Sequence, residues 1–120
     1  MRVKPKVIDV LIPAWNEEGS LPLVIQDLPK DWVRKIVVCD NGSTDGTAAV
    51  ALANGAEVVT EKSRGYGNAC LAGIRYLNSL PASEQPEIVV FIDGDYSDFP
   101  EELPLVVRPI INEDKDLVIG

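Results

Sequence analysis

The sequence contains no histidine and only two cysteines in its 120 residues. Without histidine the chain lacks the commonest general base and cannot build a Ser-His-Asp triad, so acid–base chemistry would have to use carboxylates. Cys39 and Cys70 form no Cys-x-x-Cys pair, which excludes zinc ligation of the usual kind. We expect both cysteines to be small buried apolar side chains.

Positive charge and long apolar runs are also scarce. The chain has 11 Lys and Arg residues against 19 Asp and Glu residues, a formal net charge of −8. This balance argues against non-specific binding to nucleic acid and against docking on anionic lipid through this segment. The apolar run 10–12 ends at Pro13, too soon for a signal peptide or a transmembrane span. The sequence therefore predicts a cytoplasmic domain.

Two common nucleotide-binding motifs are missing. The segment Arg64-Gly65-Tyr66-Gly67 is followed by Cys70 where a Gly-x-Gly-x-x-Gly motif would need its last glycine. No Gly-Lys-Ser or Gly-Lys-Thr of the P-loop kind occurs either. A dehydrogenase and a P-loop kinase are therefore poorly supported.

Apolar strand-like runs alternate with helix-like segments over one domain, residues 1–120. The predicted strands are 7–12, 35–40, 57–60, 88–92 and 117–119, and the predicted helices are 21–28, 44–53, 66–80 and 100–111. We expect Ser20 to cap the first helix, and Ser43 or Thr44 to cap the second.

The strands are apolar throughout, which implies burial on both faces. The chain therefore belongs to the α/β class, with an open, mainly parallel Rossmann-like sheet and helices on both faces. In such sheets ligands bind at the carboxyl ends of the strands, so functional residues should directly follow strands. Polar clusters do so at 13–18, 40–47, 62–68 and 93–95.

Asp93-Gly94-Asp95 follows the fourth predicted strand and puts two carboxylates one residue apart. Hard oxygen ligands of this kind suit Mg²⁺ or Mn²⁺, which commonly bridge to substrate phosphates. The glycine would allow close approach of the backbone. The alternative interpretation is a turn in which Asp and Gly satisfy local geometry.

Two further residues suit a nucleotide. Asp40, at the end of the second predicted strand, could accept hydrogen bonds from a base or a ribose. Arg64 could place its guanidinium near a base or a phosphate. The polar residues after Asp40 have the alternative role of helix capping.

Taken together, these motifs resemble the N-terminal part of family 2 glycosyltransferases, which have the GT-A fold. The resemblance covers nearly the whole chain and is nearest to the polyprenyl- and dolichyl-phosphate sugar transferases. The matching segments occur in the family's order, at 12–18, 38–47, 64–68 and 91–95, followed by Pro100 and Glu101.

The resemblance implies roles for individual residues. A nucleotide would be bound by the following set: Pro13, Ala14, Asn16, Glu17, Asp40, Asn41, Arg64, Asp93 and Gly94. Within that set Asp40 would meet the base or ribose, and Arg64 would lie near the base. Asp93 and Asp95 would hold Mg²⁺ or Mn²⁺ on the diphosphate.

The resemblance also implies a reaction. A UDP- or GDP-linked sugar would be transferred with inversion to an acceptor such as a polyprenyl phosphate or a saccharide, and a carboxylate would deprotonate the acceptor. Family members continue well past Gly120, and that later region usually supplies the base. We therefore expect a chain truncated at its C-terminus, which by itself binds nucleotide weakly and transfers no sugar.

The chain departs from the family at three positions, and two rival functions stay open. Asn41 stands where the family often has Asp; Ser97 and Asp98 stand where the dolichyl-phosphate group often has Gln and His. One rival is a non-catalytic nucleotide-binding domain that associates with another subunit or with itself. The other, a sugar-phosphate nucleotidyltransferase, would carry a glycine-rich basic segment after its first strand, whereas residues 15–18 read Trp-Asn-Glu-Glu.

Overall fold

The structure of the chain is a computed structural model that describes residues 7–95 and 117–119. Its five strands form one parallel sheet in the order β3-β2-β1-β4-β5. They are β1 (Ile8–Ala14), β2 (Lys35–Asp40), β3 (Glu57–Thr60), β4 (Ile88–Phe91) and β5 (Leu117–Ile119). The open, parallel α/β sheet predicted from the sequence is confirmed.

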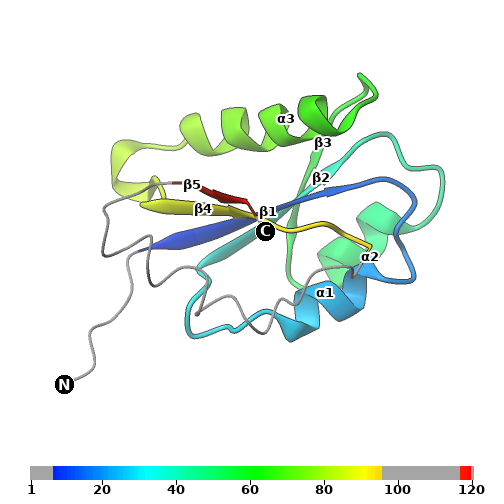
Figure 1. Cartoon of the computed structure of the whole chain (residues 1–120), viewed down its shortest axis with the longest axis horizontal. Helices are drawn as coiled ribbons and strands as arrows, with labels where there is room; N and C mark the ends of the chain where they lie inside the picture. The colour runs from blue at the N-terminus through cyan, green and yellow to red at the C-terminus, as the bar shows by residue number, and fades with distance from the viewer. Residues whose placement is uncertain (1–6, 96–116, 120) are drawn as a thin grey trace.

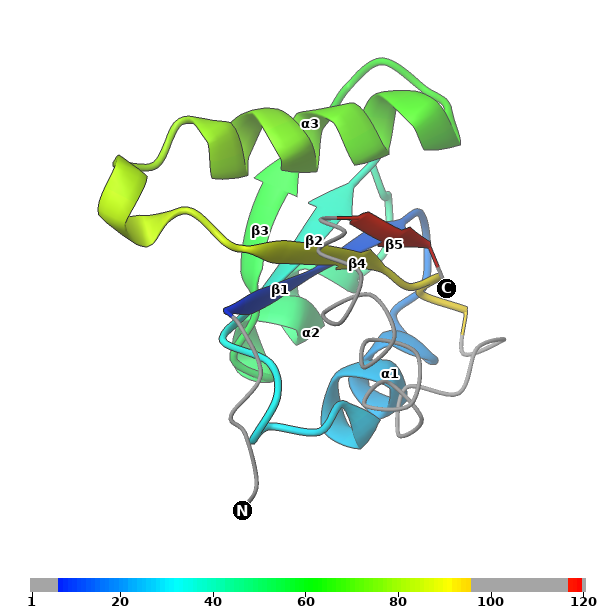
Figure 2. The same cartoon turned by 60° about the vertical axis from the view of Figure 1, so that its left-hand side comes forward.

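Helices cover both faces of the sheet. Figures 1 and 2 show α3 (Tyr66–Asn78) on one face, and α1 (Leu21–Asp27) and α2 (Thr47–Ala53) on the other. A short 3-10 helix, η1 (Ala82–Glu84), precedes β4. The predicted helix 100–111, with Ser97 and Asp98 before it, lies outside the described residues.

The alternation of side chains along β1 builds the two halves of the core. Every residue of β1 is buried. Val10 and Ile12 pack with α1 and α2, whereas Leu11 packs with α3. Burial of both faces explains why β1 reads as a continuous apolar run rather than an alternating one.

Pro13 lies inside β1, which ends at Ala14, two residues beyond the predicted end of that strand. Leu11 O accepts a hydrogen bond from Ile92 N, so Leu11, and two residues later Pro13, direct their backbone groups toward β4. The pairing of β4 with β1 stops at Phe91, opposite Leu11. The missing N–H of proline therefore costs no ladder hydrogen bond.

The topology reverses direction at β1. From β1 the chain moves through β2 to β3 on one side, and then returns to place β4 and β5 on the other side. The carboxyl ends of β1 and β4 consequently flank a crevice, which is the usual ligand site of an open α/β sheet.

Candidate functional site

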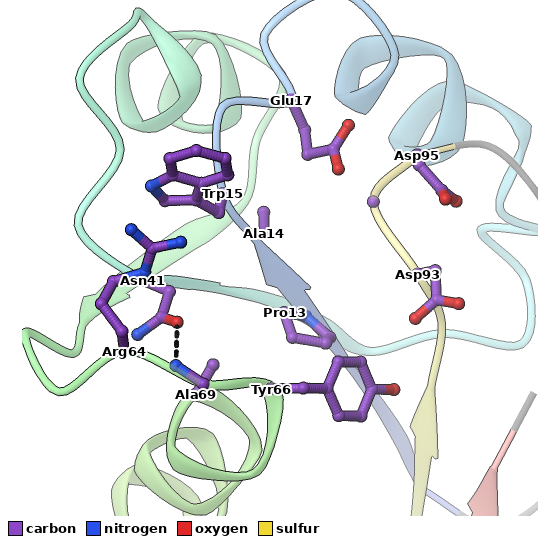
Figure 3. A pocket seen from close by; sticks show the side chains of 12 residues that line it. Pro13, Ala14, Trp15, Glu17, Asn41, Arg64, Tyr66, Ala69, Asp93 and Asp95 are labelled. Atoms are coloured by element: carbon purple, nitrogen blue, oxygen red, sulfur yellow. Dashed lines mark hydrogen bonds between the residues drawn. The ribbon is translucent and has the colours of Figure 1, made fainter.

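A pocket of about 420 Å³ opens at the carboxyl ends of β1 and β4. Figure 3 shows its lining residues, which come from the end of β1, from the loops after β1, β2, β3 and β4, and from the start of α3. They are Pro13, Ala14, Trp15, Glu17, Asn41, Arg64, Gly65, Tyr66, Ala69, Asp93, Gly94 and Asp95. Segments distant in sequence thus converge where the topology predicts a site.

The pocket collects most of the residues that the sequence suggested for nucleotide and metal. Only Asn16 and Asp40 of that set are absent from its lining. Asp40 is buried, and its Oδ1 accepts a hydrogen bond from Ser43 N at 3.1 Å. This hydrogen bond closes the turn that follows β2, so the Asp40 side chain stabilises that turn. Nucleotide binding by any of these residues stays a prediction.

Asn16 joins the loop after β1 to the loop after β2. Its backbone is left-handed, with φ of 51°, which Asn tolerates better than most residues. Its N–H donates to Ser43 Oγ at 2.9 Å, and its Oδ1 accepts from Thr44 N at 2.9 Å. Asn16 therefore makes a reciprocal pair of hydrogen bonds with the second loop.

The interlock of these two loops continues along the next residues. Glu17 N donates to Thr47 Oγ1 at 2.9 Å, and Gly46 N donates to Glu18 Oε2 at 3.3 Å. The Thr47 hydroxyl also contacts Asp45 and lowers the pKa of that carboxyl. Glu17 is thereby held at the pocket by its own backbone.

The predicted capping of α2 by Ser43 or Thr44 is wrong. The helix begins at Thr47 instead of Thr44, and its N-cap is Gly46, which has no side chain. The first helical amide, Thr47 N, donates instead to Asp45 Oδ1 at 3.0 Å. Residues 44–46 are bends, and Ser43, Thr44 and Gly46 form hydrogen bonds with the first loop, which compete with helix formation. Ser43 and Thr44 therefore have a structural role, as the helix-capping alternative also implied. Their hydrogen-bond partner is Asn16 in the loop after β1, and not the helix that follows them.

Ser20 fixes the loop that carries Asp93 and Asp95. It occupies the N-cap position of α1 but makes no side-chain cap, so the predicted capping role is wrong. Its hydroxyl lies 2.6 Å from Gly94 O and 3.1 Å from Glu17 Oε2, both of which can only accept. The Ser20 hydroxyl therefore links Gly94, between Asp93 and Asp95, to Glu17 in the segment after β1.

Gly94 packs against the end of β1 without demanding glycine. A Cβ built there would lie 3.4 Å from Ala14 Cβ and 3.5 Å from Pro13 O, which is ordinary contact. The packing against protein atoms therefore does not require glycine here, and close approach of this backbone to a ligand stays a prediction.

Tyr66 is a lining residue that the sequence analysis did not single out. Its side chain is 55% exposed, and its hydroxyl points toward Asp93 (Figure 3). Burial of the hydroxyl end, and then the charge of Asp93, raise the pKa of Tyr66. The phenol is therefore protonated at neutral pH and can donate to Asp93. A tyrosine between two glycines after a strand was the available signal.

The two cysteines belong to the core under α3 and do not line the pocket. Burial raises the pKa of the Cys39 thiol to about 12 and also raises the pKa of Cys70. Both are therefore neutral thiols and poor nucleophiles at neutral pH. Cys39 is buried as expected, whereas Cys70 is only half-buried.

Trp15 and Arg64 form the opposite wall. The guanidinium carbon of Arg64 lies 4.2 Å from the centroid of the Trp15 ring, a cation–π contact, and Trp15 is 43% exposed. Figure 3 shows the guanidinium beside the indole at the pocket. No role was predicted for Trp15 itself, although an isolated tryptophan in a polar loop after a strand is a signal of a binding site.

Comparison with known proteins identifies this architecture. The family model described as Glycosyl transferase family 2 matches residues 9–120. The chain belongs to glycosyltransferase family 2. The resemblance recognised in the sequence motifs is thereby confirmed.

Two curated relatives are similar to this family 2 chain over nearly its whole length. An uncharacterised glycosyltransferase of Mycobacterium tuberculosis is 41% identical over 113 residues, which are 94% of this chain and 47% of that protein. The UDP-N-acetylglucosamine–dolichyl-phosphate N-acetylglucosaminyltransferase of Methanococcus voltae is 29% identical over 133 residues, covering 96% of this chain and 51% of that protein. The chain spans about half the length of these curated relatives.

Solved structures confirm the GT-A type fold. The glucosyl-3-phosphoglycerate synthase of Mycobacterium tuberculosis, crystallised with Mn²⁺, UDP and glucosyl-3-phosphoglycerate, matches with a TM-score of 0.72 and 32% identity. The match covers 88% of this chain and 40% of that one. Another crystal structure of that synthase contains Mn²⁺ and UDP-glucose.

The oxygen atoms that line the pocket determine which metal ion it could hold. Among the residues that the structure describes, no group of three Asp, Glu or Cys side chains could hold a metal ion. Asp93 and Asp95 offer hard carboxylate oxygens, which suit Mg²⁺ or Mn²⁺. A cation bound there would complete its shell with water or with oxygens of a ligand.

No helix within residues 7–95 has both the length and the apolar character needed to cross a bilayer.

Proposed function

We propose that this domain binds a nucleoside-diphosphate sugar with Mg²⁺ or Mn²⁺ in the pocket between β1 and β4. The whole protein would transfer that sugar with inversion to an acceptor. The observation that carries the proposal is the convergence of two chemistries in one pocket. Arg64 and Trp15 offer a flat, cationic and aromatic wall, and Asp93 and Asp95 offer carboxylates across from it.

The two walls suit the two ends of a nucleoside diphosphate. An aromatic ring and a guanidinium both stack favourably on a nucleobase. Carboxylates repel a diphosphate unless a cation lies between them, so Asp93 and Asp95 would act through a bound metal. When bound, that metal offsets the charge of the departing nucleoside diphosphate.

The remaining residues position these groups. Ser20 holds the backbone between Asp93 and Asp95, and the Tyr66 hydroxyl orients Asp93. The Glu17 backbone is fixed by Thr47. We infer a UDP-linked donor because the related synthase binds UDP and UDP-glucose with Mn²⁺. We also infer a lipid-linked phosphate as the acceptor of the whole protein, because the relative from Methanococcus voltae is a dolichyl-phosphate N-acetylglucosaminyltransferase.

Calorimetric titration of the chain with UDP and with GDP, with and without Mn²⁺, tests the proposal. We expect UDP to bind only weakly without Mn²⁺, and Asp95→Asn to weaken Mn²⁺-dependent binding by about tenfold or more, since a metal ligand is lost. Asp31→Asn, which makes the same charge change at an exposed residue before β2, should leave the affinity unchanged. A folded chain that binds neither nucleotide would contradict the proposal.

The wall formed by Trp15 and Arg64 has a separate test. In a Trp32→Phe background Trp15 is the only tryptophan, so its emission should change when UDP binds. Arg64→Met keeps the aliphatic stem and removes the cation, and it should weaken UDP binding by about threefold to thirtyfold. Lys62→Met removes a neighbouring exposed cation that does not line the pocket. Equal losses in both variants would point to general electrostatic attraction instead of stacking.

A further inference from the structure

Asn41 lines the pocket, yet its side chain is occupied by the protein itself. Its Nδ2 donates to Glu61 O and to Ser63 O, both at 2.9 Å, and its Oδ1 accepts from Gly65 N at 2.9 Å. The residue is only 6% exposed. Both of its N–H groups are therefore used, and Asn41 has no donor left for a ligand.

Only a carboxamide can make these three contacts at once. Two partners are carbonyl oxygens and the third is an N–H, so they fix which end of the amide is nitrogen. An aspartate in the same place would keep the contact with Gly65 N but would face two carbonyl oxygens without a proton to donate. Leaving buried acceptors unmatched in this way is costly. The replacement of a common family Asp by Asn at this position thus has a physical consequence within the chain.

The loop that Asn41 holds is the one that carries Arg64. Ser63 and Gly65, whose backbone groups bond Asn41, are the residues directly before and after Arg64. The dashed line in Figure 3 marks the contact with Gly65. Gly65 has φ of 130°, a left-handed conformation that favours glycine. Asn41 therefore holds the backbone on both sides of Arg64 by hydrogen bonds, and the Arg64 guanidinium lies against the Trp15 ring.

We propose that Asn41 is a positioning residue that holds loop 61–65 so that Arg64 lies against Trp15 at the pocket. Asn41 acts on a bound nucleotide through Arg64. This inference rests on the proposed function for its effect on nucleotide affinity, whereas the clamp on the loop can be tested without any nucleotide.

A double-mutant cycle measures the action through Arg64. Asn41→Ala removes the clamp without adding charge, and we expect it to weaken UDP binding in the presence of Mn²⁺ by about threefold to tenfold, within the effect of losing Arg64 itself. In an Arg64→Met background the same change should alter the affinity by less than about twofold, because coupled residues are not additive. Additive losses would overturn the proposal.

Two measurements need no nucleotide. Trypsin should cut after Lys62 or Arg64 about tenfold faster in Asn41→Asp, because the loop loses two hydrogen bonds and opens more often. In a Trp32→Phe background, Asn41→Ala should change Trp15 emission in the same direction as Arg64→Met does. If only Arg64→Met changes the emission, Asn41 does not position Arg64.

Asn54→Asp is the matched control for charge and chemistry. Its Nδ2 donates to Val50 O at 2.8 Å at the end of α2, remote from loop 61–65. It should leave cleavage at Lys62 and Arg64 and the UDP affinity unchanged. If the unaltered chain fails to bind UDP, the proposed function fails, while the cleavage and emission measurements still decide whether Asn41 clamps the loop.

Discussion

Arg34→Met is expected to lower the free energy of unfolding by about 3 kcal/mol, the lower end of the range for breaking a buried ion pair. Asp9 lies at the start of β1 with a side chain that is 0% exposed, and Arg34 Nε and Nη2 donate to its two oxygens at 3.0 and 2.5 Å. The hydrogen bond with Asp9 raises the pKa of Arg34. Without the guanidinium a buried carboxylate has lost its cation. Because Arg34 is a third exposed, water can reach the site and limit the loss.

Urea unfolding followed by circular dichroism measures this change. Lys35→Met is the control, since Lys35 bonds the more exposed Glu57 at 3.3 Å and should contribute about 1 kcal/mol or less. Adding Asp9→Val to Arg34→Met should recover most of the loss, because an apolar pair of similar volume replaces the charges. A loss below 1 kcal/mol in Arg34→Met would show that Asp9 does not need this partner.

Gly73→Ala is expected to destabilise the protein by about 1 to 3 kcal/mol, even though alanine is the better helix former. A Cβ at Gly73 would lie 2.5 Å from Cys39 Sγ and 3.1 Å from both terminal carbons of Leu11. These atoms belong to the buried face of the sheet, so α3 would have to move away from β1 and β2. The steric cost exceeds the gain of about 1 kcal/mol in helix propensity.

Gly67→Ala in the same helix is the control, because a Cβ there meets no atom within 4 Å. We expect that variant to be neutral or slightly more stable. In a Cys39→Ala background, where the sulfur is gone, Gly73→Ala should cost about 1 kcal/mol less. Thermal unfolding of the four variants distinguishes a steric cause from a general loss of helix stability, which would affect Gly67→Ala as well.

The strands and the position of the site were predictable from the sequence. Buried parallel strands read as continuous apolar runs, and glycine or polar residues end them, so β2 and β3 fall at their predicted residues. Parallel connection then brings the carboxyl ends of β3 and β4 to the same edge as that of β1, which is why Arg64 and Asp93 could be assigned to one pocket before their geometry was known.

The use of individual polar side chains could not be predicted in this way. Ser20, Ser43 and Thr44 have the composition of helix caps, and local propensity predicts caps. In the structure Ser20 bonds Gly94, and Ser43 and Thr44 bond Asn16. Their partners are distant in sequence and become neighbours only after the sheet has formed.

The amino-acid sequence by itself determined the α/β class, the order of most elements and the family, because hydrophobic periodicity and short motifs are local properties. Tertiary structure decided which neighbouring residues face the pocket. Asp40 and Asn41 are adjacent, yet one closes its own turn and the other holds loop 61–65. Trp15 and Tyr66 became pocket walls only when Arg64 and Asp93 were placed beside them. The physical reason is that hydrogen bonds and stacking depend on distances of a few ångströms, which the packing of separate elements sets.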